Sequence, residues 1–242
     1  MSQTLAIVPA KRNSTEVPDK NWKPIAPDGM NCVALAKHVA FHSCDRTVIT
    51  TDHDKADGVM SSRRQSGLTE RWDEREHLTI VGRPDGLCTP EASMLDVIRH
   101  ALSVVPGPND EIIVLLQPTS PLRTVETVKK AIQMLEEAGT AAHSVVSVSP
   151  SYPLEWSMTI SAGELEDHNG GCIGAFPARR QDCKPTYKRD GVVYAFRRTS
   201  PAIWGDIYGA VALPLHTPPA ESLSIDTPED WDEAVRRLKE RG

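Results

Sequence analysis

Cysteines are few in this sequence, and their spacing predicts neither a cross-linked fold nor a zinc site. The chain has five, Cys32, Cys44, Cys88, Cys172 and Cys183, and no two of them form a Cys-x-x-Cys pair. Disulfide frameworks use an even number of cysteines, and structural zinc sites use closely spaced pairs. An odd number of isolated cysteines is typical of a reducing compartment, so we expect a cytoplasmic location.

Long apolar runs, an excess of positive charge and the common nucleotide-binding signatures are also missing. No apolar run approaches the ~20 residues that span a bilayer, and the N-terminus lacks the pattern of a secretion signal. The 27 Lys and Arg residues are outnumbered by 33 Asp and Glu residues, for a net charge of −6. We therefore expect no membrane and no nucleic-acid partner. Without a P-loop, a Gly-x-Gly-x-x-Gly or a Gly-x-Ser-x-Gly motif, the chain fits no ordinary ATPase, dinucleotide oxidoreductase or serine hydrolase.

The 242 residues do contain an alternation of short apolar runs with helical patterns. Strands are predicted at Leu5–Pro9, Thr47–Thr51, Ile112–Leu116, Ser144–Val148 and Val192–Phe196. Helices are predicted from Ala34 to His42, from the N-cap Thr124 to Gly139, and from Thr227-Pro228 onward. The alternation predicts one α/β domain over residues 1–242, with a mostly parallel sheet flanked by helices.

Residues 150–186 differ from this pattern, because turn signals replace helical periodicity there. The segment is interrupted by Ser151-Tyr152-Pro153, Gly170-Gly171 and Arg179-Arg180. We interpret it as a small inserted arm. Such an arm either covers a substrate or pairs with a second subunit, and the residues favour neither role over the other.

A polar, basic loop, Ala10–Asn21, directly follows the first predicted strand. Backbone N–H groups in a tight turn bind anions, and Lys11, Arg12 and Lys20 are suited to neutralise a triphosphate. A solvent-exposed basic loop without a ligand explains this segment, taken alone, equally well. Later segments of the chain decide between the two interpretations.

A second polar segment, Leu115–Thr124, connects a predicted strand to a predicted helix and contains two prolines. Ligands of open α/β sheets bind outside the carboxyl ends of strands, so Gln117, Ser120 and Arg123 are candidates to touch one. Thr124 is interpreted as a helix cap rather than a ligand.

Two more segments carry charge next to predicted strands. Four basic residues, Arg179, Arg180, Lys188 and Arg189, precede the last predicted strand and suit an acidic substrate or a pyrophosphate. Asp226 ends a predicted short strand just before a capped helix, where its carboxylate can hold Mg²⁺ or act only as a cap.

In this order the segments resemble the cytidylyltransferases that activate acidic sugars, above all the CMP-sialic acid synthetases. The family pattern Ala-Arg-x-x-Ser-Lys-x-x-Pro-x-Lys-Asn corresponds to Ala10–Asn21. The motifs Ser-Thr-Asp, Arg-Pro, Leu-Leu-Gln-Pro-Thr-Ser-Pro-Leu-Arg, Arg-Gln and Ile-Asp-Thr correspond to Thr50-Thr51-Asp52, Arg83-Pro84, Leu115–Arg123, Arg180-Gln181 and Ile225-Asp226-Thr227. The resemblance covers most of the chain, and the run from Leu115 to Arg123 is its most specific match.

The resemblance implies transfer of CMP from CTP to a small acidic acceptor, with release of pyrophosphate. It also implies a Rossmann-like domain of the nucleotide-diphospho-sugar transferase type, Mg²⁺ as cofactor and a homodimer. The residues expected to bind the nucleotide are Lys11, Arg12, Asn13, Ser14, Lys20, Asn21, Arg83, Ala92 and Ser93. The residues expected at the acceptor are Gln117, Ser120, Arg123, Arg180, Gln181, Lys188 and Tyr194. Catalytic roles are expected for Lys11, Lys20 and Asp226, with Asp226 as the metal ligand.

Three departures from the family pattern bear on the metal and the acceptor. Lys11 replaces an arginine, Thr15-Glu16 replaces a lysine and a glycine, and Ser224 replaces the first carboxylate of an Asp-Ile-Asp pair. Mg²⁺ binds with one or two carboxylates plus phosphates and waters, so Asp226 can suffice. We expect a sialic-type nonulosonic acid as acceptor, with a small phosphonic acid such as phosphonoformate as the alternative. A non-catalytic nucleotide-binding regulatory protein is the rival from another class.

Overall fold

The computed structural model describes residues 2–12, 14, 16–52, 71–73, 77–89, 91–167 and 179–241. The strands are β1 (Thr4–Ala10), β2 (Arg46–Thr51), β3 (Arg71–Asp73), β4 (Leu78–Gly82), β5 (Ile112–Leu115), β6 (Ser144–Pro150), β7 (Met158–Ser161), β8 (Glu164–Asp167), β9 (Tyr187–Arg197) and β10 (Ala212–His216). The α-helices are α1 (Cys32–Ser43), α2 (Met94–Val104), α3 (Val125–Ala138), α4 (Ser200–Ile203) and α5 (Pro228–Arg241). Short 3-10 turns lie at Asp85–Leu87, Leu154–Trp156 and Arg180–Asp182.

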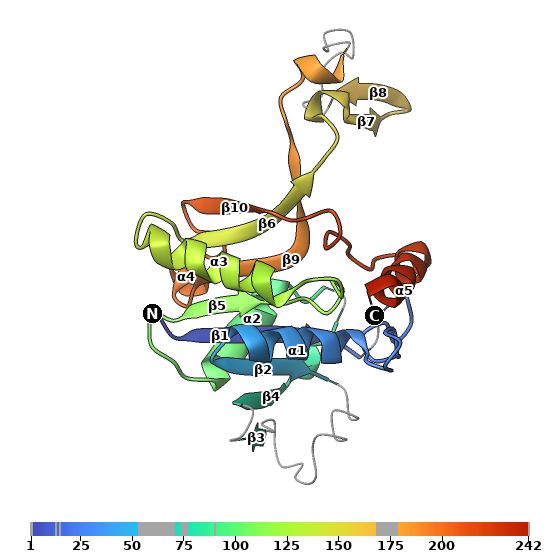
Figure 1. Ribbon diagram of the computed structural model, residues 1–242. Coiled ribbons are helices and arrows are strands. Elements are labelled where there is room, and N and C mark those ends of the chain that lie inside the picture. Colours follow the sequence, from blue (N-terminus) through green and yellow to red (C-terminus); the bar gives the residue numbers. More distant parts are fainter. Residues whose placement is uncertain are drawn as a thin grey trace.

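Eight of these strands form one sheet in the order β10-β6-β9-β5-β1-β2-β4-β3 (Figure 1). β1 pairs in parallel with β2 and β5, β2 with β4, and β6 with β10. β9 runs antiparallel between β5 and β6, and β3 is antiparallel to β4. The predicted mostly parallel α/β sheet is therefore confirmed. Because β1, β2 and β5 run in one direction, their carboxyl ends meet at one edge, on the right of Figure 1.

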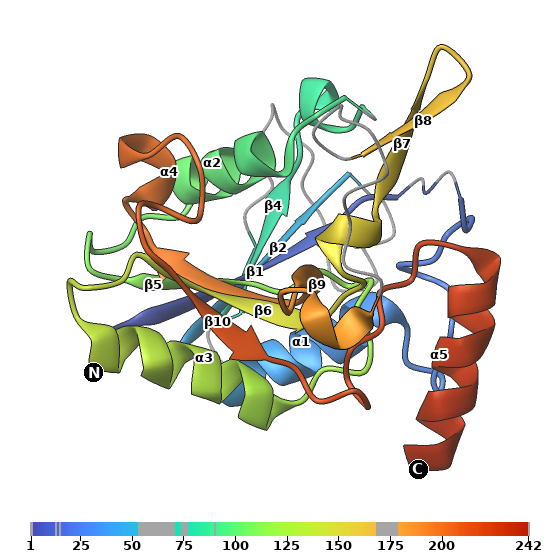
Figure 2. The same ribbon diagram turned by 90° about the horizontal axis from the view of Figure 1, so that it is seen from above.

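Helices cover both faces of the sheet (Figure 2). On the face of α1 and α3, Val8, Ala36 and Leu135 belong to one buried apolar cluster. On the face of α2, Leu5 and Ile98 belong to a second cluster. Successive side chains of a strand point to opposite faces, so β1 supplies both clusters, and all seven of its residues are buried.

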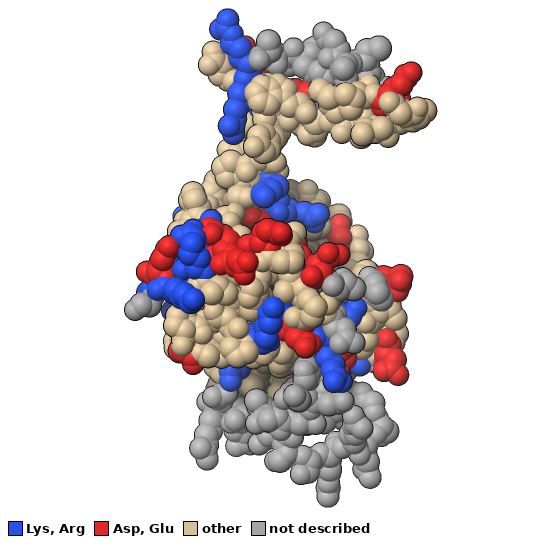
Figure 3. Space-filling view, turned by 90° about the vertical axis from the view of Figure 1, so that its right-hand side faces the viewer, with Lys and Arg blue, Asp and Glu red and all other residues tan. Residues whose placement is uncertain are grey.

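The arm predicted at residues 150–186 carries its own two-stranded sheet, in which β7 pairs antiparallel with β8. It stands above the body on a narrow neck (Figures 1 and 3). Apolar side chains are exposed on it, including Ile160 at 78% and Leu165 at 54%. Whether the arm covers a substrate or pairs with a second subunit stays a prediction.

The last helix, α5, begins at the predicted proline and is held by a capping box. Thr227 Oγ1 accepts from the Asp230 backbone N at 3.2 Å, and Asp230 Oδ2 accepts from the Thr227 backbone N at 2.8 Å. Ala234 and Leu238 bury the apolar face of α5 in a third cluster. The short strand predicted before Asp226 was wrong, because residues 222–226 belong to none of the strands in the described part of the chain. Among the described residues, no helix has both the length and the apolarity needed to cross a membrane.

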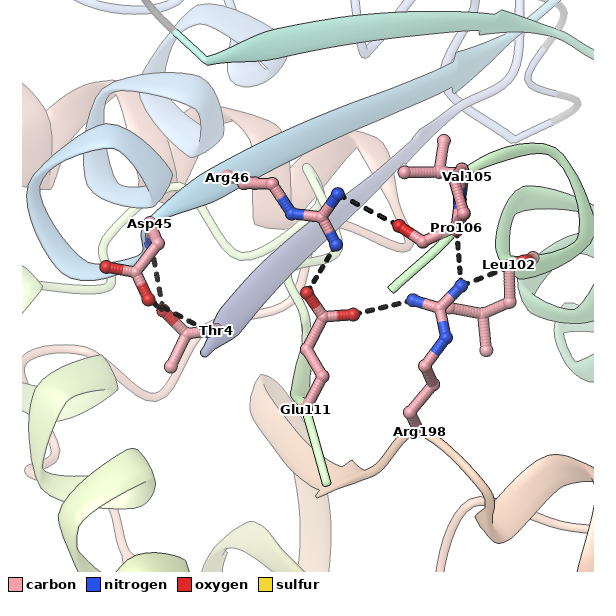
Figure 4. A network of polar contacts seen from close by, with 8 residues as sticks. All are labelled: Thr4, Asp45, Arg46, Leu102, Val105, Pro106, Glu111 and Arg198. Atoms are coloured by element: carbon pink, nitrogen blue, oxygen red, sulfur yellow. Dashed lines mark hydrogen bonds and ion pairs between the residues drawn. The ribbon is translucent and has the colours of Figure 1, made fainter. Parts of the chain in front are cut away.

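A buried ion-pair network lies near the amino ends of the central strands (Figure 4). The Glu111 carboxylate, with a side-chain exposure of 0%, accepts from Arg46 at 2.5 Å and from Arg198 at 2.6 Å. Arg198 also donates to the Leu102 carbonyl at 2.9 Å, and Arg46 donates to the Pro106 carbonyl at 3.0 Å. The network therefore ties β2, β5 and the end of β9 to the C-terminal end of α2.

Candidate active site

Two cavities open at the carboxyl edge of the sheet, where ligands of open α/β sheets bind. Figure 3 views this edge directly, and basic and acidic side chains are interspersed on it below the arm. We call the first the β1 cavity, because the loop after β1 lines it, and the second the β9 cavity, because β9 lines it. Their volumes are about 360 Å³ and about 600 Å³.

The β1 cavity is lined by three segments, residues 9–21, 83–97 and 117–119, and the first two contain predicted nucleotide-binding residues. Its polar lining residues are Lys11, Ser14, Glu16, Lys20, Asn21, Arg83, Thr89, Gln117 and Thr119, and its apolar ones are Pro9, Leu87, Ala92, Met94, Val97 and Pro118. Two lysines and an arginine around a partly apolar floor suit a ligand that has both phosphates and a planar base. Glu16, which stands where the family pattern has glycine, adds a negative charge to this cavity.

The loop after β1 is held in shape by its own polar side chains. Asn21 is buried, its Nδ2 donates to the Lys11 carbonyl at 2.9 Å, and its Oδ1 has no hydrogen-bond partner among the residues that the structure describes. Lys20 Nζ donates to the Ile225 carbonyl at 2.6 Å, which joins this loop to the segment that carries Asp226. This hydrogen bond therefore holds Lys20 against the segment that carries Asp226.

Arg83 and the start of α2 form the opposite side of the β1 cavity. Arg83 Nη2 donates to the Thr50 carbonyl at 3.1 Å, and burial lowers the pKa of this arginine. Ala92 lines the cavity, whereas the Ser93 hydroxyl caps α2 by accepting from the Asp96 backbone N at 3.1 Å. Ser93, predicted to bind the nucleotide, is thus placed at the helix start and does not line the cavity.

Two other predicted residues of the first loop are not seen in the cavity lining. Arg12 is exposed, and its backbone N donates to Asp52 Oδ1 at 2.6 Å. Asn13 lies outside the described residues. The described part of the loop therefore presents Lys11, Ser14 and Lys20 to a ligand.

The β9 cavity has walls of opposite charge. One wall consists of Gln117 with Lys188, Arg189, Asp190, Gly191 and Tyr194, and the other of Ser222, Leu223, Ser224, Asp226 and Asp230. Tyr194 is partly buried, and this burial raises the pKa of its hydroxyl. Gln117 lines both the β9 cavity and the β1 cavity. The glutamine predicted from the motif is therefore at the junction of the two.

Gly191 lets β9 approach this junction closely. Its φ is +78°, and a Cβ there would lie 3.1 Å from Gln117 Oε1 and 3.3 Å from Ser120 Oγ. The Gly191 carbonyl accepts from Ser120 Oγ at 3.0 Å and from Arg123 Nη2 at 3.4 Å. A side chain at this position would therefore disturb the wall.

Arg123 supports the same wall from behind. It is only 5% exposed, and its Nη2 also donates to the Gln117 carbonyl. Burial lowers the pKa of Arg123 to about 9, although Cys32, Asp190 and other acidic groups oppose this. Ser120 and Arg123, both predicted at the acceptor, lie behind the cavity wall and line neither cavity.

The acidic wall contains a carboxylate suited to a metal ion. Asp226 is exposed and lines the β9 cavity, while Asp230 Oδ2 accepts from the Asp226 and Thr227 backbone N atoms. Burial raises the pKa of Asp230, but the two backbone donors and the Lys20 charge outweigh it and lower the pKa overall. No group of three His, Cys, Asp or Glu side chains within the described ranges could hold a metal. Mg²⁺ needs only one or two carboxylates beside substrate phosphates, so Asp226 fits that ion.

Arg180 and Gln181 lie in the arm, apart from the β9 cavity. They line a separate cavity of about 270 Å³ near the neck, together with Cys183, Lys184 and Tyr187. Within this chain the structure does not bring them to Gln117. Arg189, one of the four basic residues predicted to suit an acidic substrate, does line the β9 cavity, and so does Asp230, for which no site role was predicted. The basic residues before the predicted strand Val192–Phe196 were the signal for Arg189, which lies within β9, whereas Asp230 resembled an ordinary helix cap.

Comparison with known proteins identifies relatives along nearly the whole chain, although no protein-family model matches it. CMP-N,N'-diacetyllegionaminic acid synthase of Legionella pneumophila is 27% identical over 237 residues, which cover 94% of this chain and 92% of the relative. N-acylneuraminate cytidylyltransferases of Streptococcus agalactiae serotype III and Escherichia coli O18:K1:H7 are 26% and 22% identical and match 97% of this chain. The chain spans about half the length of these two, 53% and 52%.

Two solved structures share the fold. A CMP:2-keto-3-deoxy-manno-octonic acid synthetase complexed with CTP has a TM-score of 0.68 at 12% identity and covers 100% of both chains. The 4-diphosphocytidyl-2C-methyl-D-erythritol synthase of Anaerococcus prevotii has a TM-score of 0.60 at 14% identity and covers 98% of this chain and 96% of its own. The Rossmann-like fold of nucleotide-sugar transferases is thereby confirmed. The curated relatives confirm the predicted resemblance to cytidylyltransferases of acidic sugars, which are nucleotidyltransferase enzymes.

Proposed function

We propose that this protein transfers CMP from CTP to a sialic-type nonulosonic acid and releases pyrophosphate. The observation that carries the proposal is the position of Gln117, which lines a cavity rich in basic groups and an adjoining cavity with one basic and one acidic wall. A transfer reaction needs its two substrates side by side in fixed orientation. Two cavities that share one side chain meet this requirement.

The β1 cavity supplies what CTP needs. Lys11 and Lys20 provide the positive charge for a triphosphate, and Ser14 adds a hydroxyl. Arg83, Ala92 and the apolar residues beside them form the part of the cavity suited to cytosine. The names of the curated relatives, CMP-sugar synthase and cytidylyltransferase, support CTP over other nucleotides.

The β9 cavity supplies what an acidic acceptor needs. Lys188 and Arg189 offer two positive charges, and Gln117 and Tyr194 offer hydrogen bonds to hydroxyl and amide groups. Its volume of about 600 Å³ accommodates a nine-carbon sugar acid more naturally than a one-carbon phosphonic acid. The relatives give no support to the phosphonic-acid alternative.

The chemistry proposed here requires alignment and charge neutralisation rather than a covalent intermediate. An acceptor oxygen held in the β9 cavity attacks the α-phosphorus of a nucleotide held in the β1 cavity, and the P–O bond to pyrophosphate breaks. Lys11 and Lys20 neutralise negative charge that moves onto the leaving pyrophosphate. Asp226 would hold Mg²⁺, which supplies further charge neutralisation when bound. Ser224 and Thr15 replace charged residues of the family pattern, and this is the reason to consider a non-catalytic nucleotide-binding protein. Measured turnover would exclude that alternative.

A homodimer is part of the proposal. The exposed apolar side chains of the arm, Ile160 and Leu165 among them, support an arm that packs against a second copy. Arg180 and Gln181 lie in the same arm, so their predicted contact with the acceptor would be made in a partner's site. Sedimentation equilibrium of the wild type, with Ile160→Asp as comparison, tests this. A monomeric wild type would contradict it.

Pyrophosphate release tests the proposed reaction. The purified protein is assayed with CTP, ATP, GTP or UTP, with and without Mg²⁺, against sialic-type acids, 3-deoxy sugar acids and small phosphonates. We expect release with CTP, Mg²⁺ and a sialic-type acid. Asp226→Asn should abolish turnover with an unchanged melting temperature, whereas Asp232→Asn, an exposed neighbour on α5, should not affect turnover. CTP binding without turnover on any acceptor would favour the non-catalytic rival.

A further inference from the structure

We propose that Tyr208 is a positioning residue that fixes the Arg189 guanidinium at the β9 cavity, where Arg189 recognises the carboxylate of the acidic acceptor. The proposal rests on the proposed function and adds to it a residue that determines specificity for the acceptor carboxylate. Tyr208 is in the connection between α4 and β10, lines neither cavity and has no counterpart among the motifs of the sequence.

The contact between the two side chains has two components. Arg189 Nη1 donates a hydrogen bond to the Tyr208 hydroxyl. The Arg189 guanidinium carbon also lies 5.4 Å from the centroid of the Tyr208 ring, within the range of a cation–π interaction. Arg189 is itself exposed, so without these contacts its long side chain would sample many rotamers. Tyr208 therefore selects one orientation of the guanidinium.

Tyr208 can do this because its own backbone is fixed to the sheet. Its backbone N donates to Asp206 Oδ1 at 2.7 Å, and the next residue, Gly209, donates to the same oxygen at 2.8 Å. Its carbonyl accepts from Ser144 Oγ at 2.8 Å, and Ser144 is a buried residue at the start of β6. The phenol thus projects from an anchored turn toward β9.

The charge of Arg189 is available to a ligand. No acidic side chain in the described ranges forms an ion pair with it. The adjacent Asp190 is buried, and its Oδ1 accepts from Ser147 Oγ at 2.6 Å and from the Val192 backbone N at 3.2 Å. A guanidinium offers five N–H donors, and the Tyr208 hydroxyl accepts from only one nitrogen. The remaining donors can form the two parallel hydrogen bonds that a carboxylate accepts.

Steady-state kinetics with two substrates separate this role from a general structural one. With CTP and N-acetylneuraminate, Tyr208→Phe should raise the acceptor KM about fivefold, the effect of one lost hydrogen bond of ordinary strength, and leave the KM for CTP and kcat unchanged. With the methyl ester of the same sugar, which has no carboxylate charge, the variant should equal the wild type. Tyr152→Phe, an exposed tyrosine that lines no described cavity, is the matched control and should leave both KM values unchanged.

A double-mutant cycle tests whether Tyr208 acts through Arg189. Arg189→Met should raise the acceptor KM at least tenfold, and adding Tyr208→Phe to it should cause no further rise. A further fivefold rise in the double variant would overturn the proposal, as would a Tyr208→Phe effect of equal size on CTP or on the methyl ester.

The guanidinium can also be observed without turnover. In ¹⁵N-labelled protein, a fixed Arg189 should give separate Nη signals that merge in Tyr208→Phe, with Arg189→Met identifying the signals. Equal mobility in wild type and variant would overturn the positioning role alone. A wild type that releases no pyrophosphate with any acid would instead contradict the proposed function and, with it, the assignment of the carboxylate.

Discussion

Glu111→Gln tests whether the buried ion pairs at the amino end of the sheet stabilise the fold. The substitution keeps the shape of the side chain and removes its negative charge, so Arg46 and Arg198 lose their shared partner. Removing one partner of a buried ion pair costs about 3–5 kcal/mol, because the remaining charge is left without compensation. Arg46 is 21% exposed and Arg198 10%, so water reaches part of that charge. We therefore expect a loss of about 3 kcal/mol in the free energy of unfolding.

Urea unfolding followed by circular dichroism measures this loss. For a chain of this size we take an m-value of about 3 kcal/mol per M, so the midpoint should fall by about 1 M without a change in slope. The melting temperature should fall by roughly 6–12 °C, at about 2–4 °C per kcal/mol. Pyrophosphate release at a temperature where the variant stays folded should be close to wild type, since the network is at the opposite end of the sheet from both cavities.

Glu233→Gln is the matched control, because Glu233 also contacts two arginines, Arg236 at 2.7 Å and Arg237 at 2.6 Å. These contacts lie on the surface of α5, and the hydrogen bonds from the two arginines lower the pKa of Glu233 to about 2. Exposed ion pairs contribute little to stability, so the urea midpoint should not move measurably. The reasoning would be refuted if Glu111→Gln shifted the midpoint no more than this control.

Three further results are expected. Lys20→Met should weaken CTP binding about tenfold in calorimetry, because one charge-assisted contact is lost; an unchanged Kd would remove this lysine from the nucleotide site. Gly191→Ala should lower stability by about 1–2 kcal/mol and raise the acceptor KM, whereas Gly139→Ala, also at positive φ but with nothing within 4 Å, should lower stability only. Burial raises the pKa of Cys32 and Cys44 from 9.0 to about 12, so both should resist iodoacetamide at pH 8. Rapid labelling of either cysteine in the native protein would contradict the predicted resistance. Because the unfolded chain loses these protons near pH 9, the free energy of unfolding should fall as the pH rises from about 9 to 12.

Local sequence signals predicted five of the ten described strands and three of the five described α-helices, and α2, β4 and β10 are among the elements that were not predicted. Thr124 caps α3 by accepting from the Thr127 backbone N at 3.2 Å, and Gly139 follows the helix with a φ of +56°, both as expected from their residue types. The five predicted strands all form, with ends shifted by one or two residues in most and by five at the start of β9. Caps, turns and apolar periodicity depend on neighbours in sequence, so they can be read without the fold.

The antiparallel position of β9 was not predicted, and it shapes the candidate site. β9 inserts between β5 and β6, which brings Arg189 and Gly191 beside Gln117. Strand order is decided by contacts between segments far apart in the chain, so residue types alone do not reveal it. The same limit explains Arg123, which resembled a ligand-binding arginine but is buried beneath the wall.

The sequence by itself determined the α/β class, both ends of α3, the start of α5, the loop after β1 and the motif around Gln117, because each depends on local geometry or on a contiguous run of residues. Only the tertiary structure decided that Gln117 lines both cavities, that Tyr208 contacts Arg189, and that Arg180 lies apart in the arm. These facts depend on which strands pair and which side chains become buried. Both are properties of the whole packed chain rather than of any segment within it.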